Sequence, residues 1–147
     1  MHHLNESDIQ ETARRFCRYL GINNLTPGNF AQFLEQLSRY KICIDPVDDG
    51  EWPWFVEATC DPREFHIMLP NSTYEEACRG DHAAISTLFH EIGHIILGHR
   101  ALLHKAGSAP PTREEDAEWQ ADEFAACVAR RMKIVPWQLS FDFGGDK

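Results

Sequence analysis

The sequence predicts an α+β protein with a small antiparallel sheet. Two observations indicate this class: apolar residues recur at helical spacing towards both ends of the chain, and three short segments in the middle are rich in β-branched and aromatic residues. The 147 residues suit one compact domain and are short for two. Within that single domain, residues 1–147, we expect a helical lead-in (1–40), the sheet (41–70) and two later helices (81–99 and 112–132).

The composition is that of an ordinary water-soluble protein, with 43% hydrophobic and 25% charged residues. No apolar run approaches the roughly 20 residues needed to cross a bilayer, and the first residues lack the apolar stretch of a secretory signal. The five cysteines are scattered without a C-x-x-C pair, which argues against a disulfide framework and against a cysteine-ligated zinc cluster. We therefore expect a cytoplasmic protein that does not enter a membrane.

The chain is acidic, with a formal net charge of -9. Direct binding to nucleic acid normally requires a basic stripe, and the sequence shows none. An acidic surface is compatible with a basic protein partner, such as a DNA-binding regulator. We therefore expect a protein partner and no direct contact with nucleic acid.

Two amphipathic helices are expected in the lead-in. Ser7 begins a capping-box pattern that would open a helix to about Leu20, and Gly21 would end it. Thr26 and Pro27 then combine an N-cap residue with proline at the first helical position, which predicts the start of a second helix.

The middle of the chain changes to the composition of strands. The three predicted strands are Lys41–Ile44, Trp54–Ala58 and Phe65–Leu69, separated by turn-forming Asp-Gly and Asp-Pro pairs. The last of them could bind an extended peptide along its edge, or it could be an ordinary core strand.

Two further helices follow the sheet. Asp81 can cap a helix that runs to about Leu97, where Gly98 would end it. Thr112 begins a second capping-box pattern and opens a last helix to about Met132, after a loop rich in glycine and proline.

The first of these helices carries an H-E-x-x-H motif made by His90, Glu91 and His94. Residues four apart lie one turn apart on the same helix face, so the two imidazoles can converge on a single Zn²⁺ ion. Glu91 is rotated by about 100° and can take a proton from water beside the metal. The alternative is a pair of ordinary histidines on a buried helix. Against it, the apolar stripe of this helix lies on the side opposite the imidazoles, at Ile85, Leu88, Phe89, Ile92 and Ile96.

The last helix offers a third ligand. Catalytic zinc sites usually have three protein ligands and an open position for water. Glu118 and Asp122 lie four apart on one face, and small residues there and at Gly93 would let the two helices approach closely. Glu118 could then reach the metal, and Asp122 could accept the free N–H of a ligand histidine. The alternative is a solvated acidic face near a helix N-terminus that includes Glu118.

Two longer segments resemble one known family. Residues 90–99 (HEIGHIILGH) and 118–125 (EWQADEFA) look like the paired motifs of the ImmA/IrrE metallopeptidases, in which an HEIGH-type helix precedes an E-x-E-A-N-x-F-A helix. The resemblance covers approximately the second half of the chain. It implies a zincin-like fold of the gluzincin type, Zn²⁺ as cofactor, Glu118 as third ligand and Asp122 as partner of a ligand histidine. The chain departs from the family at Gln120, where Glu is usual, and at Asp122, where Asn is frequent.

The same resemblance implies a function. We expect a zinc-dependent endopeptidase that uses metal-activated water and cleaves a transcriptional repressor or a stress- or phage-type regulator, with Glu91 as the general base. An alternative is a non-proteolytic zinc-containing regulatory protein, similar to a toxin–antitoxin or anti-repressor partner, that acts by sequestration. Glu91 favours catalysis, because a purely structural site does not need it. A metal-free helical domain is the third interpretation, and the oligomeric state is left open.

Two further questions concern the site. A metzincin would need a third histidine at position 100, which is Arg100, so that class is rejected. The residue that stabilises the developing oxyanion could be Tyr74, His99 or His104, and the sequence does not rank them. His99 could instead cap the C-terminus of its helix.

Overall fold

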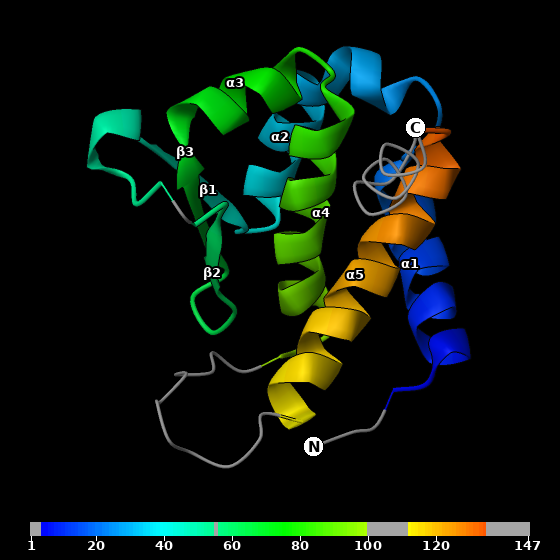
Figure 1. Ribbon diagram of the computed structural model, residues 1–147. Coiled ribbons are helices and arrows are strands. Elements are labelled where there is room, and N and C mark those ends of the chain that lie inside the picture. Colours follow the sequence, from blue (N-terminus) through cyan, green and yellow to red (C-terminus); the bar gives the residue numbers. More distant parts are fainter. Residues whose placement is uncertain (1–3, 55, 100–111, 135–147) are drawn as a thin grey trace, which may run out of the picture.

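The computed structural model describes residues 4–54, 56–99 and 112–134, and it confirms the α+β class (Figure 1). Within these ranges, the chain forms five α-helices, two short 3₁₀ helices and one three-stranded sheet. No described helix has the length and apolar character needed to span a membrane. In chain order the elements are α1 (Glu6–Leu20), η1 (Thr26–Asn29), α2 (Phe30–Arg39), β1 (Cys43–Val47), η2 (Asp49–Glu51), β2 (Thr59–Asp61), β3 (His66–Pro70), α3 (Asn71–Cys78), α4 (His82–Ile96) and α5 (Thr112–Met132).

Helix α1 is capped two residues before the predicted position. The side chain of Asn5 accepts a hydrogen bond of 2.8 Å from the backbone N–H of Asp8, and the carboxylate of Asp8 accepts one of 3.3 Å from the N–H of Asn5. The capping box is therefore Asn5 with Asp8, and the prediction that it starts at Ser7 was wrong, because Asp8 suits the third helical position as well as glutamate does. The predicted end is confirmed, since Gly21 adopts the left-handed conformation with φ of 68°.

The second helix begins later than predicted. Thr26 and Pro27 open the 3₁₀ helix η1, and the α-helix starts at Phe30 without a side-chain cap. The hydroxyl of Thr26 instead accepts a hydrogen bond of 3.0 Å from the backbone N–H of Asn23, which closes the preceding turn. Thr26 thus stabilises the turn before η1 and does not cap α2.

The sheet is mixed, so the predicted antiparallel sheet was wrong for one of its two pairings. The strand order is β1-β3-β2, with β1 parallel to β3 and β2 antiparallel to β3. The predicted strand Trp54–Ala58 is also wrong: within the described residues the strand starts only at Thr59. A turn precedes it, in which the indole Nε1–H of Trp52 donates a 2.5 Å hydrogen bond to the carbonyl of Val56.

Helix α3 was not predicted at all. It follows β3 directly, with Pro70 at its N-cap, and it buries a single side chain, Ala77. A helix that buries so little has no apolar periodicity for a sequence pattern to reveal.

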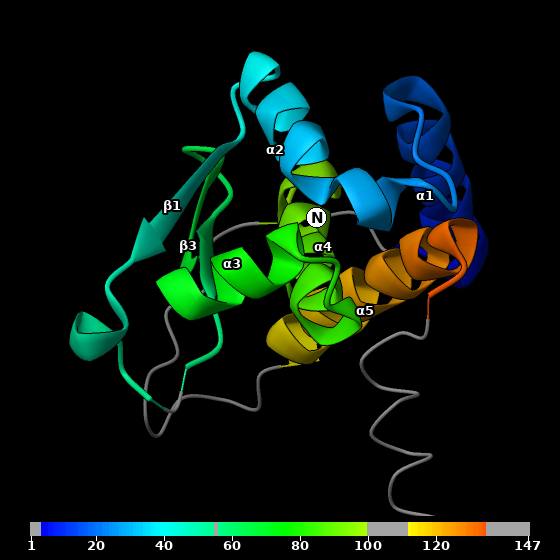
Figure 2. The same ribbon diagram turned by 90° about the horizontal axis from the view of Figure 1, so that it is seen from above.

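Helices α4 and α5 form the centre of the molecule. The carboxylate of Asp81 accepts a hydrogen bond of 2.9 Å from the N–H of Ala84, which confirms the predicted cap of α4. Helix α4 lies between the sheet on one side and the α1–α5 pair on the other (Figures 1 and 2). A Cβ added at Gly93 would lie 3.1 Å from Phe124 Cδ1 and 3.4 Å from Ala121, so glycine is what lets α4 and α5 approach here.

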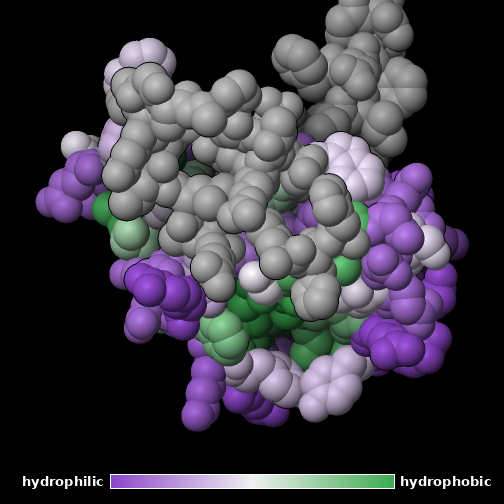
Figure 3. All heavy atoms as spheres, turned by 90° about the horizontal axis from the view of Figure 1, so that it is seen from below, coloured by the Kyte–Doolittle hydropathy of each residue, from purple (hydrophilic) through white to green (hydrophobic). Residues whose placement is uncertain are grey.

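The core is aromatic where the helices meet. Five phenylalanine rings from α1, α2, α4 and α5 form a connected cluster, in which paired rings have centroid distances between 5.3 and 6.3 Å: Phe16, Phe30, Phe33, Phe89 and Phe124. Seen from below, apolar residues form a patch in the lower middle of the face, with hydrophilic residues to its left and right (Figure 3). This packing holds α4 and α5 in a fixed relation, and it therefore positions the polar side chains that these helices carry on their other faces.

Candidate metal centre

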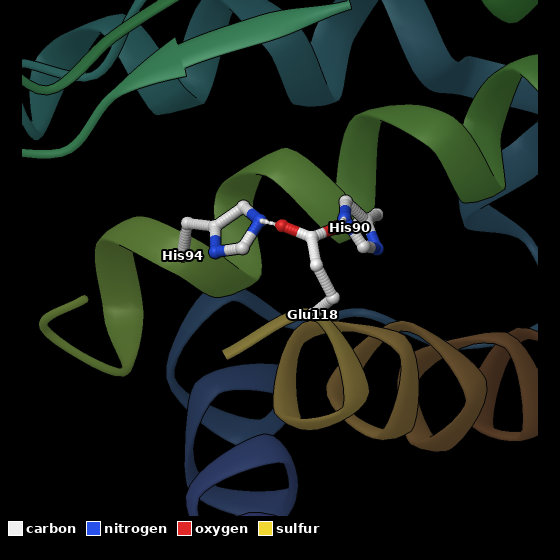
Figure 4. A group of neighbouring side chains, drawn as sticks. All are labelled: His90, His94 and Glu118. Atoms are coloured by element: carbon white, nitrogen blue, oxygen red, sulfur yellow. Dashed lines mark hydrogen bonds and ion pairs between the residues drawn. The ribbon is translucent and has the colours of Figure 1, made fainter. Parts of the chain in front are cut away.

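Two helices bring three potential metal ligands together. His90 and His94 project from α4, and Glu118 reaches across from α5 and lies between their rings (Figure 4). Ligand atoms of the three residues lie within 4.8 Å of one another. One carboxylate oxygen of Glu118 is 3.0 Å from Nε2 of His90, and the other is 3.1 Å from Nε2 of His94. This group could hold a metal ion.

The remaining nitrogen of His90 is occupied by Asp122, one turn after Glu118 on α5. Its Nδ1 atom lies 2.7 Å from Oδ1 of Asp122. The carboxylate of Asp122 accepts this hydrogen bond, so Nδ1 carries the hydrogen and Nε2 is the nitrogen available to a metal. The structure thus places Asp122 where the sequence expected the partner of a ligand histidine.

The remaining nitrogen of His94 is occupied by a buried chain of two residues. Its Nδ1 atom lies 2.9 Å from Nδ1 of His99, and Nε2 of His99 lies 2.7 Å from the side-chain oxygen of Gln120. That oxygen can only accept, so Nε2 of His99 carries a hydrogen. Burial lowers the pKa of His99, which keeps the ring neutral, and its Nδ1 therefore accepts from Nδ1–H of His94.

These hydrogen bonds indicate whether His90, His94 and Glu118 could bind a cation between them. The tautomer imposed on His94 points the lone pair of Nε2 at a carboxylate oxygen of Glu118 only 3.1 Å away. Two acceptors at that distance repel each other unless a proton or a metal ion lies between them. Two donors each about 2.0–2.1 Å from a tetrahedral zinc ion stand about 3.3 Å apart, close to the spacing observed. The three side chains, with ligand atoms within 4.8 Å of one another, could therefore hold a metal ion.

In the metal-free protein a proton takes the place of the metal at His90. Burial alone would lower the pKa of His90, but the hydrogen bonds to Asp122 and Glu118 outweigh it and raise that pKa to about 10. The hydrogen bond from His90 is the main cause that holds the pKa of Glu118 far below its ordinary value. His90 and Glu118 thus form an ion pair, and a metal ion must displace the proton on Nε2 of His90.

Glu91 lies beside the ligands in a cavity of about 280 Å³. Burial raises its pKa, although the neighbouring His90 and His94 oppose this effect. The cavity is lined by Glu57, Ala58, Ser86, Thr87, His90, Glu91, Glu118, Asp122 and Ala125. A carboxyl group with a raised pKa, next to a candidate metal site and in a cavity, can both take up and release a proton.

Of the three candidates for oxyanion stabilisation, the two that the structure describes, Tyr74 and His99, do not line this cavity. Tyr74 lies on α3 and lines a different cavity, together with Leu34 and Ile44. His99 is buried, with both ring nitrogens engaged by His94 and Gln120. His104 lies outside the described residues.

The sequence did not identify Gln120 as a residue of the site. Gln120 appeared there only as a departure from the family pattern, yet it is 5% exposed and bonded to His99. Its position in the sequence pattern could have indicated a buried residue, because Gln120 falls between Ala117 and Phe124 on the face of α5 that turns to the core. A polar residue on a buried helix face needs a partner.

The edge of the sheet next to the site is β2. Strand β3 lies between β1 and β2, so the expectation that Phe65–Leu69 offers a free edge was wrong. Strand β2 packs against α4, where the thiol of Cys60 donates a 3.5 Å hydrogen bond to the carbonyl of Glu91. Ala58, just before β2, lines the cavity.

Comparison with protein-family models, with curated proteins and with solved structures found no match to this chain. The likeness of residues 90–99 and 118–125 to the ImmA/IrrE motifs therefore remains a prediction from the sequence. The molecule itself offers a group of three ligands, a carboxyl group at their side and a cavity in front of them.

Proposed function

We propose that this protein is a zinc-dependent endopeptidase with a zincin-like, gluzincin-type site of the ImmA/IrrE kind. One observation carries the proposal: the carboxylate of Glu118 lies between Nε2 of His90 and Nε2 of His94, with Glu91 in the same cavity. Two imidazoles and one carboxylate are a common ligand set of catalytic zinc, and they leave a position for water or substrate.

The proposed roles follow from these positions. When bound, zinc supplies Lewis acidity, which lowers the pKa of water to about 7 and polarises the scissile carbonyl. Asp122 and the His99–Gln120 pair keep the two imidazoles in the tautomer that presents Nε2. Glu91 takes a proton from the attacking water and then donates it to the leaving amine, and its raised pKa supports both steps.

The exposed side of β2 gives the substrate a place to bind. An extended peptide can add to a sheet edge by main-chain hydrogen bonds; β2 is an edge strand, and Ala58, just before it, lines the cavity. We propose that the substrate is a transcriptional repressor or another stress- or phage-type DNA-binding regulator in the cytoplasm. The net charge of -9 is compatible with a basic protein of this kind.

The test replaces the carboxylate of Glu91 with an amide. We expect the zinc-loaded protein to cleave members of a mixed synthetic peptide library, Glu91→Gln to keep its zinc and lose all cleavage, and Glu64→Gln, an exposed control, to behave like the wild type. New peptide termini are read by mass spectrometry and zinc by elemental analysis. A wild-type protein that holds zinc but cleaves nothing would contradict the proposal and favour a regulator that sequesters its partner.

A further inference from the structure

A second cavity, of about 410 Å³, adjoins the metal cavity. The two cavities share Glu57 and Thr87 as wall residues, so they lie side by side. The second cavity, here called the tryptophan groove, is lined by Asp49, Trp52, Trp54, Val56, Glu57, Pro70, Ser72, Thr73, Glu76, Asp81, Ala83, Ala84 and Thr87. A peptide chain that passes the metal site can therefore place a neighbouring side chain in it.

The lining of the tryptophan groove has a marked chemical bias. It contains four carboxyl side chains and two indole rings, and none of its described lining residues is basic. The indole of Trp52 is held by its hydrogen bond to the carbonyl of Val56, and the side chain of Trp54 is 91% exposed. An indole face attracts cations, and it also gives the aliphatic stem of a long side chain an apolar surface to lie on.

Two of the four carboxylates already have structural roles. Asp49 accepts hydrogen bonds from the backbone N–H and the hydroxyl of Ser72, and Asp81 caps α4. Within the described part of the chain, the carboxylates of Glu57 and Glu76 show no hydrogen bond or ion pair. They are thus available to a cation that enters the groove.

Ser86 gives an independent indication that a ligand completes this region. It lines the metal cavity one turn before His90 and next to Thr87, and it is only 5% exposed. Among the described residues its hydroxyl has no hydrogen-bond partner. Buried hydroxyl groups nearly always have one. A substrate main chain that runs from the metal towards the tryptophan groove would supply it.

We propose that the tryptophan groove binds a lysine or arginine side chain of the substrate, close to the scissile bond, while Ser86 bonds the substrate main chain. This proposal rests on the proposed peptidase function. A cationic side chain satisfies Glu57 and Glu76 and stacks on the indoles, whereas an acidic one would be repelled by all four carboxylates. An apolar one would remove Glu57 and Glu76 from water without compensation.

The matched pair Glu76→Gln and Glu75→Gln tests the groove. Both residues are exposed on α3, and only Glu76 lines the groove. The probes are two synthetic peptides that differ only in lysine or glutamine at the position preferred in a library cleavage profile. We expect the ratio of kcat/KM for the lysine peptide to that for the glutamine peptide to fall about tenfold in Glu76→Gln and to stay unchanged in Glu75→Gln. A cleavage profile without lysine or arginine enrichment near the scissile bond, or equal effects of the two variants, would overturn the proposal.

Ser86→Ala supplies a second readout. We expect KM to rise several-fold while the Tm stays unchanged or rises, because the variant removes a buried hydroxyl that has no partner. A lower Tm with unchanged KM would instead make Ser86 a structural residue.

Binding measurements test the tryptophan groove independently of catalysis. If zinc-loaded wild-type protein cleaves no peptide, the peptidase proposal fails. The groove is then judged by the affinity of zinc-loaded Glu91→Gln protein for two synthetic peptides that differ only in lysine or glutamine at one position. Tighter binding of the lysine peptide would support the groove, and equal binding would contradict it.

Discussion

Nε2 of His99 lies 2.7 Å from the side-chain oxygen of Gln120, and through His99 this contact reaches Nδ1 of His94. A neutral amide on α5 therefore determines which nitrogen of His94 faces Glu118. The Asp122–His90 contact of 2.7 Å has the same effect on the other imidazole, but with a charged acceptor. One ligand histidine is thus oriented by a carboxylate and the other by a neutral relay.

The relay predicts a difference between two substitutions at Gln120. Gln120→Leu removes the acceptor and leaves a buried N–H on His99, so we expect the zinc affinity to fall about 10- to 100-fold. Gln120→Glu keeps an acceptor in the same place, and its affinity is expected to stay within a few-fold of the wild type. Competition with a chromophoric chelator measures both. Similar losses in the two variants would show that Gln120 serves only packing.

Metal content tests the ligand group directly. We expect about one zinc ion per chain, a near-complete loss in His90→Ala and an appreciable loss in Glu118→Ala. His82→Ala is the matched control, because His82 is exposed on the same helix, two turns before His90. Elemental analysis after purification without chelator gives the result. Full zinc content in Glu118→Ala would remove Glu118 from the ligand set.

The metal-free protein should lose stability as the pH rises. The folded pKa of His90 is raised to about 10, against roughly 6.5 in an unfolded chain, so its contribution is fully present below pH 6.5 and is lost as the pH approaches 10. Glu118 acts in the opposite direction: its pKa is lowered, so its contribution is present above its unfolded value and is lost in acid. Thermal unfolding of chelator-treated protein between pH 6.5 and 9.5 measures the slope. His90→Asn should flatten it, and a wild-type Tm that is constant over this range would contradict the His90–Glu118 ion pair.

Gly93 should tolerate no larger residue. Alanine is normally the better helix former, but its Cβ would lie 3.1 Å from Phe124 Cδ1 and press α4 away from α5. We expect Gly93→Ala to destabilise the fold by about 1–3 kcal/mol and to weaken zinc binding, because the ligands come from both helices. Gly28→Ala is the control, since nothing lies within 4 Å of the added atom there. Chemical denaturation compares the two, and equal stabilities would show that the helices have room to separate.

The parts of the site that depend on local geometry could be predicted from the sequence. The spacing of His90 and His94 on one helix face, the pairing of Glu118 with Asp122 and the close approach at Gly93 all follow from helix periodicity and residue size. The cap at Asp81 is equally local, and the structure confirms it.

The parts that depend on distant pairing could not be predicted. Whether β1 runs parallel or antiparallel to β3 is decided by packing between elements, and nothing within Cys43–Val47 encodes it. Helix α3 buries only Ala77, so its sequence has no pattern to detect. The role of Gln120 depends on His99 from another helix end, and a single-helix argument shows only that Gln120 needs some partner.

The ligands come from two helices that are separated by a long stretch of chain, and this has a thermodynamic consequence. An ion held by both His94 and Glu118 would tie that stretch into a ring, as a covalent cross-link does. The ring reduces the number of conformations open to the denatured chain, so the cation would act on the unfolded ensemble as well as on the folded one. Chelation should therefore loosen the first turns of α5 before it affects the phenylalanine core.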